Sequence, residues 1–252
     1  MPADVRVGTS GWQYKHWMGS FYPPQITTAR TLDYYCKVFN TVEVNNSFYR
    51  LPSADTFARW RITSPKQFVF AVKGSRYLTH AKKLKDPEPG IERLFSSLEA
   101  LQEKLGPVLF QLPPQFGINL ERLESFLVAL PPGHRYTFEF RHESWNTPQT
   151  YKLLKKFNAA YCIFHLAGFQ SPIEVTADFA YIRLHGPGGK YQGKYSTADL
   201  GKWAAKIRRW KRRLKAVYVY FDNDQAGYAA ENARELVALL DTAPASHRNK
   251  HV

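Results

Sequence analysis

The chain has 252 residues, of which 44% are hydrophobic, and carries a formal net charge of +14 at pH 7. This length fits one barrel-sized domain or two small ones, and no apolar run is long enough for a transmembrane helix. The first expected strand begins near Val5, which leaves no space for a signal peptide, and Cys36 and Cys162 form no paired spacing, so we expect a reduced, cytoplasmic protein.

Eight short β-type runs alternate with helical patterns along the chain. The runs are residues 5–10, 41–46, 68–74, 107–112, 136–142, 160–165, 179–185 and 217–222. Helical patterns occupy residues 27–39, 53–63, 90–105, 119–130, 148–157, 197–214 and 226–240. Strand–helix alternation at this spacing predicts a parallel α/β sheet, and the length favours a (β/α)8 TIM-type barrel.

The pattern is weakest after the sixth run. Residues 166–178 contain Pro172 and show little helical periodicity, so we expect an irregular or missing sixth helix. No other segment has the composition of a linker. We therefore predict a single barrel domain over residues 1–244 and a flexible tail over 245–252.

Polar and charged residues fall on one parity of the eight runs. Alternate side chains of a strand share a face, and the opposite parity is mostly apolar, as expected for a sheet covered by helices. The carboxyl ends of barrel strands meet at one mouth, where active sites form. The set expected on the inner face comprises Arg6, Gly8, Ser10, Glu43, Asn45, Lys73, Gln111, Glu139, Arg141, His165, Arg183, His185 and Asp222.

This set predicts acid–base chemistry at the mouth. Glu43 or Glu139 is the candidate general base, and His185 or His142 the candidate acid. Asp222 is a further candidate catalytic group. Arg141 and Arg183 are expected to clamp a carboxylate or phosphate. The alternative interpretation is an ion network whose charges compensate one another.

Lys73, at the end of the third run, allows two interpretations. Neighbouring positive charge would lower the pKa of its amine and permit a Schiff base. A salt bridge to Glu43 is the favoured role.

A glycine-rich loop follows the seventh run. Residues 186–193 hold four glycines and precede a helix that Ser196 and Asp199 are expected to cap. Backbone N–H groups of such a loop can approach an anion, so Gly188, Gly189 and Lys194 are predicted ligand-binding residues. The alternative is a mobile lid without a ligand.

Aromatic side chains follow several runs on the same side. Trp12, Tyr14 and Trp145 are predicted to stack on a base or sugar, with loop packing as the alternative. Ser10, Asn45, Gln111 and Asn223 complete the predicted ligand-binding set.

No metal and no cofactor is predicted. A site built from His142, His165 and His185 with the mouth carboxylates is conceivable, but no HxH, HExxH or paired-cysteine spacing occurs.

Residues 202–215 contain eight basic residues and no acid. Trp203, Ile207, Trp210 and Leu214 form an apolar stripe at helical spacing, which favours a helix packed on the sheet with a solvated basic face. The alternative is a surface that follows nucleic acid phosphates.

Seven segments together resemble the YecE-like family, a domain-of-unknown-function family of (β/α) barrels. They are GTSGWQYKHWMGSFYP, FNTVEVNNSFYRLP, FAVKGSRYLTH, LGPVLFQLPP, FEFRHESW, YIRLHGPGGKYQGKYS and VYVYFDNDQAGYAAENA. The resemblance runs from about residue 5 to 240 and implies a barrel and a site position, but no reaction.

These observations favour an enzyme acting on a small anionic or phosphorylated ligand at the barrel mouth. Hydrolysis, isomerisation and lyase chemistry remain open, as does the oligomeric state. Two other functions stay as alternatives: a nucleic-acid-binding or endonuclease IV-like protein using residues 202–215, and a non-catalytic ligand sensor. No membrane partner is expected.

Overall fold

A computed structural model of the chain describes residues 3–242. The predicted tail, residues 245–252, lies outside this range. None of the helices within it is long and apolar enough to cross a lipid bilayer.

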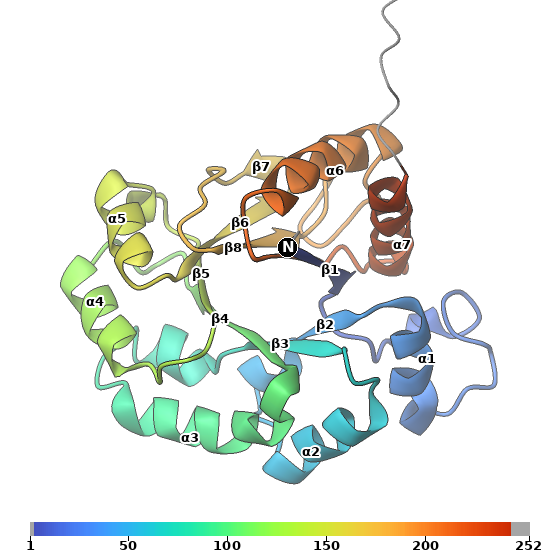
Figure 1. Cartoon of the computed structure of the whole chain (residues 1–252), viewed down its shortest axis with the longest axis horizontal. Helices are drawn as coiled ribbons and strands as arrows, with labels where there is room; N and C mark the ends of the chain where they lie inside the picture. The colour runs from blue at the N-terminus through green and yellow to red at the C-terminus, as the bar shows by residue number, and fades with distance from the viewer. Residues whose placement is uncertain (1–2, 243–252) are drawn as a thin grey trace, which may run out of the picture.

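Eight parallel strands form a nearly closed barrel (Figure 1). Around it the strands run in the order β1, β9, β8, β6, β5, β4, β3, β2. Their bounds are β1 Asp4–Thr9, β2 Thr41–Val44, β3 Val69–Lys73, β4 Leu105–Leu112, β5 Tyr136–Phe140, β6 Ala160–Leu166, β8 Phe179–Leu184 and β9 Ala216–Phe221. The predicted TIM-type barrel is confirmed.

The seam between β1 and β2 depends on a glycine. Among residues 3–242, backbone pairing of these two segments is limited to the Ser10–Glu43 bridge, where Gly11 N donates to the Glu43 carbonyl at 2.8 Å. A Cβ atom on Gly8 would lie 2.3 Å from the carbonyl oxygen of Thr41, so only glycine allows the two backbones to approach this closely.

Helices cover the outside of the barrel (Figure 1). Their bounds are α1 Thr31–Val38, α2 Ala54–Thr63, α3 Glu88–Leu98, α4 Leu120–Ala129, α5 Pro148–Lys156, α6 Thr197–Lys211 and α7 Tyr228–Asp241. The start of α6 has the predicted cap, because Ser196 Oγ accepts from the Asp199 amide at 3.1 Å and donates to its carboxylate at 2.7 Å.

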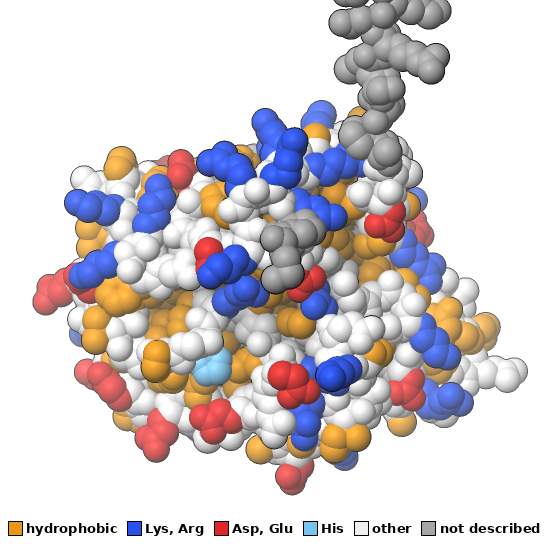
Figure 2. All heavy atoms as spheres, in the orientation of Figure 1, with side chains coloured by type: hydrophobic (Ala, Val, Ile, Leu, Met, Phe, Trp, Pro, Cys, Tyr) orange, Lys and Arg blue, Asp and Glu red, His pale blue; other side chains and the backbone are white. Residues whose placement is uncertain are grey.

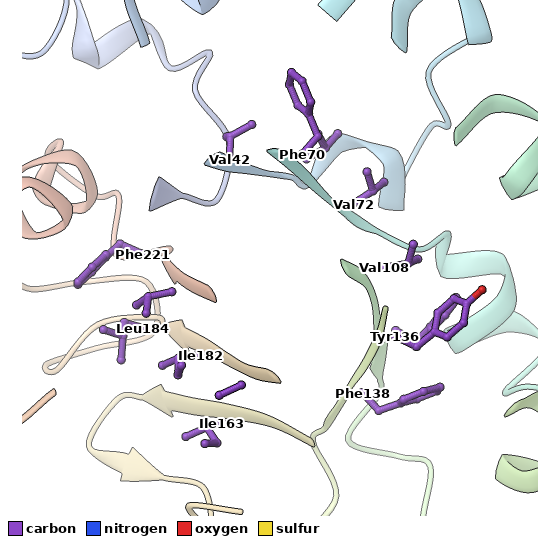
Figure 3. Close-up of a cluster of buried hydrophobic side chains, with 14 of the residues drawn as sticks. Val42, Phe70, Val72, Val108, Tyr136, Phe138, Ile163, Ile182, Leu184 and Phe221 are labelled. Carbon is purple, nitrogen blue, oxygen red and sulfur yellow. The ribbon is translucent and has the colours of Figure 1, made fainter. Parts of the chain in front are cut away.

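The two parities of the strands face two different environments. Outward side chains such as Val42, Phe70 and Ile182 point away from the barrel axis toward the helices and form the main core (Figure 3). Inward side chains form a smaller cluster that fills the barrel, made of Ala71, Leu109, Ala160, Cys162, Phe179, Tyr181, Ala216, Tyr218 and Tyr220. Charged groups are therefore confined to the ends of the barrel interior.

The segment after β6 has no helix, as predicted. A two-residue strand, β7 (Phe169–Gln170), folds back antiparallel on β6, and irregular chain then leads to β8. The expected inward position of His165 is wrong. Ala160 and Cys162 occupy the inner parity of β6, so His165 lies on the other face, where its Nδ1 is 2.9 Å from the Tyr195 hydroxyl.

Candidate active site at the barrel mouth

Arg183 lies at the centre of the polar cluster. This inward residue of β8 is 1% exposed. Its guanidinium donates to Glu43 Oε1 at 2.7 Å and to Glu139 Oε2 at 2.8 Å. It lies 3.3 Å from Asp222 Oδ2. Three carboxylates from β2, β5 and the end of β9 thus converge on one cation.

Ion pairs and hydrogen bonds offset the effect of burial on Glu139, Asp222 and Arg183. Burial alone would raise the pKa of Glu139, but Arg141 and Arg183 outweigh it and hold that pKa well below the usual range. The pKa of Asp222 is also lowered, because its hydrogen bond with His185 and the charge of Arg183 exceed the effect of burial. Burial would lower the pKa of Arg183, but the carboxylates around it raise that pKa instead.

The imidazole of His185, which directly follows β8, lies between the Asp222 carboxylate and two guanidinium groups. Its Nδ1 is 3.0 Å from Asp222 Oδ2, and its Nε2 is 3.0 Å from Arg141 Nη2 and 3.4 Å from Arg183 Nη1. A guanidinium can only donate, so Nε2 is the acceptor in its contacts with Arg141 and Arg183, and it also lies 3.6 Å from Glu139 Oε2. The contact between Nδ1 and Asp222 holds the imidazole in this orientation.

Arg141 is the more accessible guanidinium of the two. Its Nε donates to Glu139, its plane lies 4.8 Å from the Phe164 ring centre, and its side chain is 10% exposed. Arg183, in contrast, has all three nitrogens engaged. Arg141 is therefore better placed to contact a ligand.

Both carboxylate oxygens of Glu43 accept hydrogen bonds from hydroxyl groups. Ser10 donates its hydroxyl to Oε1, and Tyr181 donates to Oε2 at 2.6 Å. Asn45 donates to Ser10 Oγ at 3.2 Å, which leaves the buried Asn45 Oδ1 without a partner among the described residues. Residue periodicity did not identify Tyr181 as a member of this site, since a tyrosine inside a barrel also serves simple packing.

Lys73 differs from the favoured expectation. It is 7% exposed, and its Nζ lies 4.3 Å from the centre of the Phe48 ring. Within residues 3–242 its Nζ makes no ion pair with Glu43 and no hydrogen bond. The predicted salt bridge is wrong, because Arg183 already neutralises Glu43 and the amine lies against an aromatic face instead.

The glycine-rich loop folds over the mouth. The Tyr191 ring centre is 5.5 Å from that of His185, and Tyr191 has a φ of 62°. Asn223 holds the loop by donating to the Gly193 carbonyl at 2.9 Å and to Asn232 Oδ1 at 2.9 Å. The backbone N–H groups of Gly188, Gly189 and Lys190 have no acceptor within residues 3–242.

Several predicted residues lie apart from the Arg183 cluster. Lys194 pairs with Glu231 of α7 at 2.6 Å. His142 Nδ1 contacts Ser144 Oγ at 2.8 Å. Trp145 is buried, and its indole N–H donates to the Phe116 carbonyl at 2.7 Å. Trp12 is buried against Trp60 of α2.

Two other predicted residues lie beside the cluster without joining its ion pairs. Gln111 stands next to Glu139 in the register of β4 and β5. Tyr14 donates to the Ser10 carbonyl, and burial, with Asp222 second, raises the pKa of its phenol.

A second acid–histidine pair lies nearby and was not predicted. His16 Nε2 is 2.9 Å from Asp224 Oδ2, and the Trp17 indole donates to Asp224 Oδ1 at 2.7 Å. Burial raises the pKa of Asp224 to about 6. Asp224 lies in the loop after β9 and His16 in the loop after β1. The alternation of side chains along a strand therefore could not predict either position.

Arg183 lies between the three carboxylates of this cluster. Among residues 3–242, no group of three or more His, Cys, Asp or Glu side chains has the arrangement of a metal site. The positive charge between the carboxylates comes from the protein chain itself.

The basic end of α6 lies at the opposite end of the barrel from this cluster. Ala3 N donates to the Lys211 carbonyl at 3.0 Å and Asp4 N to the Lys215 carbonyl at 3.0 Å, which places both beside the start of β1. A hollow of about 740 Å³ at that end is lined by residues of β1, α1, α6 and α7. It contains none of the predicted catalytic residues.

Comparisons with known proteins identify relatives along the whole chain. The UPF0759 protein YunF of Bacillus subtilis is 26% identical over 274 residues, covering 94% of this chain and 95% of that protein. The UPF0759 protein YecE of Escherichia coli is 27% identical over 139 residues, covering 55% of this chain and 48% of that protein.

A solved structure has the same fold over nearly the same length. The crystal structure of a DUF72 family protein from Thermotoga maritima is 31% identical, with a TM-score of 0.86, and the match covers 95% of this chain and 100% of that one. A family model described as "Protein of unknown function DUF72" matches residues 6–251. The chain therefore belongs to the DUF72 family, as its sequence motifs indicated.

Proposed function

We propose that this protein is an enzyme that acts by acid–base chemistry on a small anionic, phosphorylated ligand at the barrel mouth. One observation carries the proposal: His185 is oriented by Asp222 through Nδ1 and presents Nε2 to Arg141. An imidazole with a fixed orientation beside an accessible cation is suited to moving a proton on a bound anion.

The buried cluster supports a functional rather than a purely structural role. A buried ion network adds little stability compared with well-packed apolar side chains of the same volume. Placing Glu43, Glu139 and Arg183 inside the barrel therefore yields little for folding alone. Perturbed titratable groups gathered at the mouth of a barrel are typical of active sites.

The anion would be bound by groups that still have free donors. Arg141 Nη1 and Lys73 Nζ have no acceptor among residues 3–242, and the N–H groups of Gly188 and Gly189 lie unpaired in the loop above. The start of α6 is a weaker candidate, because Ser196 Oγ already caps it and the negatively charged Asp199 side chain lies in its first turn. Tyr191 would have to move aside for the ligand to reach His185.

Thermal unfolding in phosphate tests the proposal. Inorganic phosphate that binds only the folded protein should stabilise it by about 1.4 kcal/mol at ten times its Kd. We expect the melting temperature to rise with phosphate, at ionic strength held constant with chloride. Arg141→Gln should lose this rise. Lys194→Gln is the matched control and should keep it, since Lys194 pairs with Glu231.

An unchanged melting temperature in millimolar phosphate would contradict the anion site. His185→Gln separates an enzyme from a ligand sensor: both need the bound anion, but only an enzyme needs the imidazole. We expect this variant to keep the phosphate response and to lose turnover of any substrate that the wild type converts.

A nucleic-acid-binding surface is the second candidate function. Lys and Arg side chains gather over α6 (Figure 2). Arg209, Arg212 and Arg213 are exposed and have no ion-pair partner among the described residues. Because this surface lies away from the mouth, it would bind nucleic acid independently of the chemistry proposed there.

A further inference from the structure

Two lysines among residues 3–242 are buried, Lys73 at the barrel mouth and Lys104 outside the barrel at the end of α2. Lys104 is 4% exposed, and its Nζ donates to the Arg61 carbonyl at 2.5 Å, the Ser64 carbonyl at 2.7 Å and Ser64 Oγ at 3.0 Å. All three of its N–H groups are used. Lys73 is 7% exposed, and within residues 3–242 its Nζ has no acceptor, only the face of Phe48.

The position of Lys73 is fixed by its backbone. It is the last residue of β3, on the inward parity, and the Ser47 hydroxyl donates to its carbonyl at 2.6 Å. Its side chain lies at the mouth near Arg183 and the cluster carboxylates, which act on its charge. A rigid strand end is a suitable support for a reacting group.

Burial makes this amine a better nucleophile than an ordinary lysine. The ammonium form of Lys73 has lost most of its hydration without gaining an acceptor among residues 3–242, which disfavours the charged form. Burial, followed by the nearby charge of Arg183, lowers the pKa of Lys73 to about 8. At pH 7.5 about a quarter of such an amine is unprotonated, against about one part in a thousand for an exposed lysine.

We propose that Lys73 forms an imine with the carbonyl carbon of an anionic aldehyde or ketone bound at the mouth. This inference rests on the proposed function and specifies its substrate class as a carbonyl compound bearing a phosphate or carboxylate.

The step balances without an oxidant or reductant. The Nζ lone pair forms the C–N bond, the carbonyl π pair moves to oxygen, and a proton passes from nitrogen to that oxygen. A second proton then lets the oxygen leave as water while the nitrogen lone pair forms the C=N bond. The negative charges of Glu139, Glu43 and Asp222 favour a cation at this nitrogen, and the charge of Arg183 opposes it.

An imine at Lys73 would allow His185 to act as a general base. An iminium ion withdraws electrons from the neighbouring carbon and makes its C–H bond acidic, and His185 Nε2 can accept that proton once the bound anion draws the Arg141 guanidinium away from it. Isomerisation and lyase chemistry use this step, whereas simple hydrolysis does not. The inference therefore narrows the reaction classes that the sequence left open.

Reductive trapping tests the imine. The folded protein is incubated with glycolaldehyde phosphate and sodium cyanoborohydride at pH 7.5, and the adducts are located by peptide mass mapping. We expect Lys73 to be labelled at least about tenfold faster than the average exposed lysine, because far more of it is unprotonated. Lys104 is the buried control and should remain unlabelled. Excess inorganic phosphate should protect Lys73 and leave exposed lysines unchanged.

A variant separates nucleophilic attack from simple charge attraction. Lys73→Arg keeps a cation at the mouth, so it should keep the phosphate-dependent rise in melting temperature and lose the trapped adduct. If that variant does not fold, the labelling pattern of the wild type alone decides.

Each outcome has one meaning. A phosphate response without preferential labelling of Lys73 overturns the imine and leaves the proposed function standing. Preferential labelling that phosphate does not block supports the amine but removes the anion site. Absence of both effects overturns both proposals.

Discussion

A single guanidinium contacts three carboxylates inside the barrel. Arg183 contacts Glu43, Glu139 and Asp222, while Arg141 adds a second contact to Glu139. Because Arg183 makes so many contacts, it cannot move to meet a ligand without leaving buried charges unpaired. We therefore regard Arg183 as the residue that positions the carboxylates, and Arg141 as the one that contacts the ligand.

Lys73 is expected to lower the stability of the folded protein. Its folded pKa of about 8 lies below the ordinary value of 10.5, so the folded state binds its proton more weakly than the unfolded state. The cost is present in full below pH 8, shrinks as the pH rises toward 10.5, and is absent above it. We expect Lys73→Met to raise the free energy of unfolding at pH 7 by about 1–3 kcal/mol.

Urea denaturation at pH 7 and pH 10 measures this difference, which should be smaller at pH 10. Lys104→Met is the matched control, and we expect it to lower the free energy of unfolding. It leaves the Arg61 and Ser64 carbonyls without their donor, at a cost of about 1–3 kcal/mol. A loss of stability at pH 7 in Lys73→Met would show that the amine has a stabilising partner.

At the scale of the strands and helices, the hydrophobic periodicity of the sequence predicted the barrel and most of the residues that face its interior. Parity placed Glu43, Glu139 and Arg183 on one inner face, because a two-residue period leaves no other arrangement once one face is apolar. The same rule placed His165 on the wrong face. Ala160 and Cys162 are the inward residues of β6, and because both are apolar the sequence does not show which face of this strand is inward.

The contacts between the strands could not be predicted in the same way. Strand parity places Lys73 and Glu43 on the same end, but it does not decide which carboxylate a cation selects. Arg183 pairs with Glu43 and excludes Lys73 from it. Likewise, His16 and Asp224 lie in loops, whose course depends on tertiary packing rather than on a period.

The β1–β2 seam offers a test of an element contact. In Gly8→Ala the new methyl group would meet the Thr41 carbonyl at 2.3 Å, so the two strands must separate. We expect a loss of about 1–3 kcal/mol of stability, as for other overpacked interiors. Gly201→Ala is the matched control: no atom lies within 4 Å of its Cβ, and alanine should stabilise α6 by about 0.5–1 kcal/mol. Equal stability of Gly8→Ala and the wild type would contradict the close approach of β1 and β2 at this position.

At the scale of the whole molecule, positively charged side chains gather in two separate regions. At the mouth it is balanced by carboxylates, whereas at the far end of α6 it faces solvent (Figure 2). Not every basic residue of that stretch is free. Arg208 donates to the Leu239 and Thr242 carbonyls and so ties α6 to the end of α7. Lys202 and Lys215 pair with Asp199 and Asp178.

This arrangement predicts that nucleic acid binding and mouth chemistry are independent. Reversing Arg209, Arg212 and Arg213 to Glu removes free cations without disturbing the Arg208 contacts. Any sequence-independent DNA binding should weaken, and the slope of log K against log salt should fall by about 0.9 for each lost phosphate contact. The phosphate-dependent rise in melting temperature should persist, because Arg141 and Lys73 lie at the other end. Arg208→Glu alone should instead reduce stability. If the triple reversal abolished both DNA binding and the phosphate response, the two surfaces would have to form one site, and nucleic acid would replace a small anion as the ligand of the mouth.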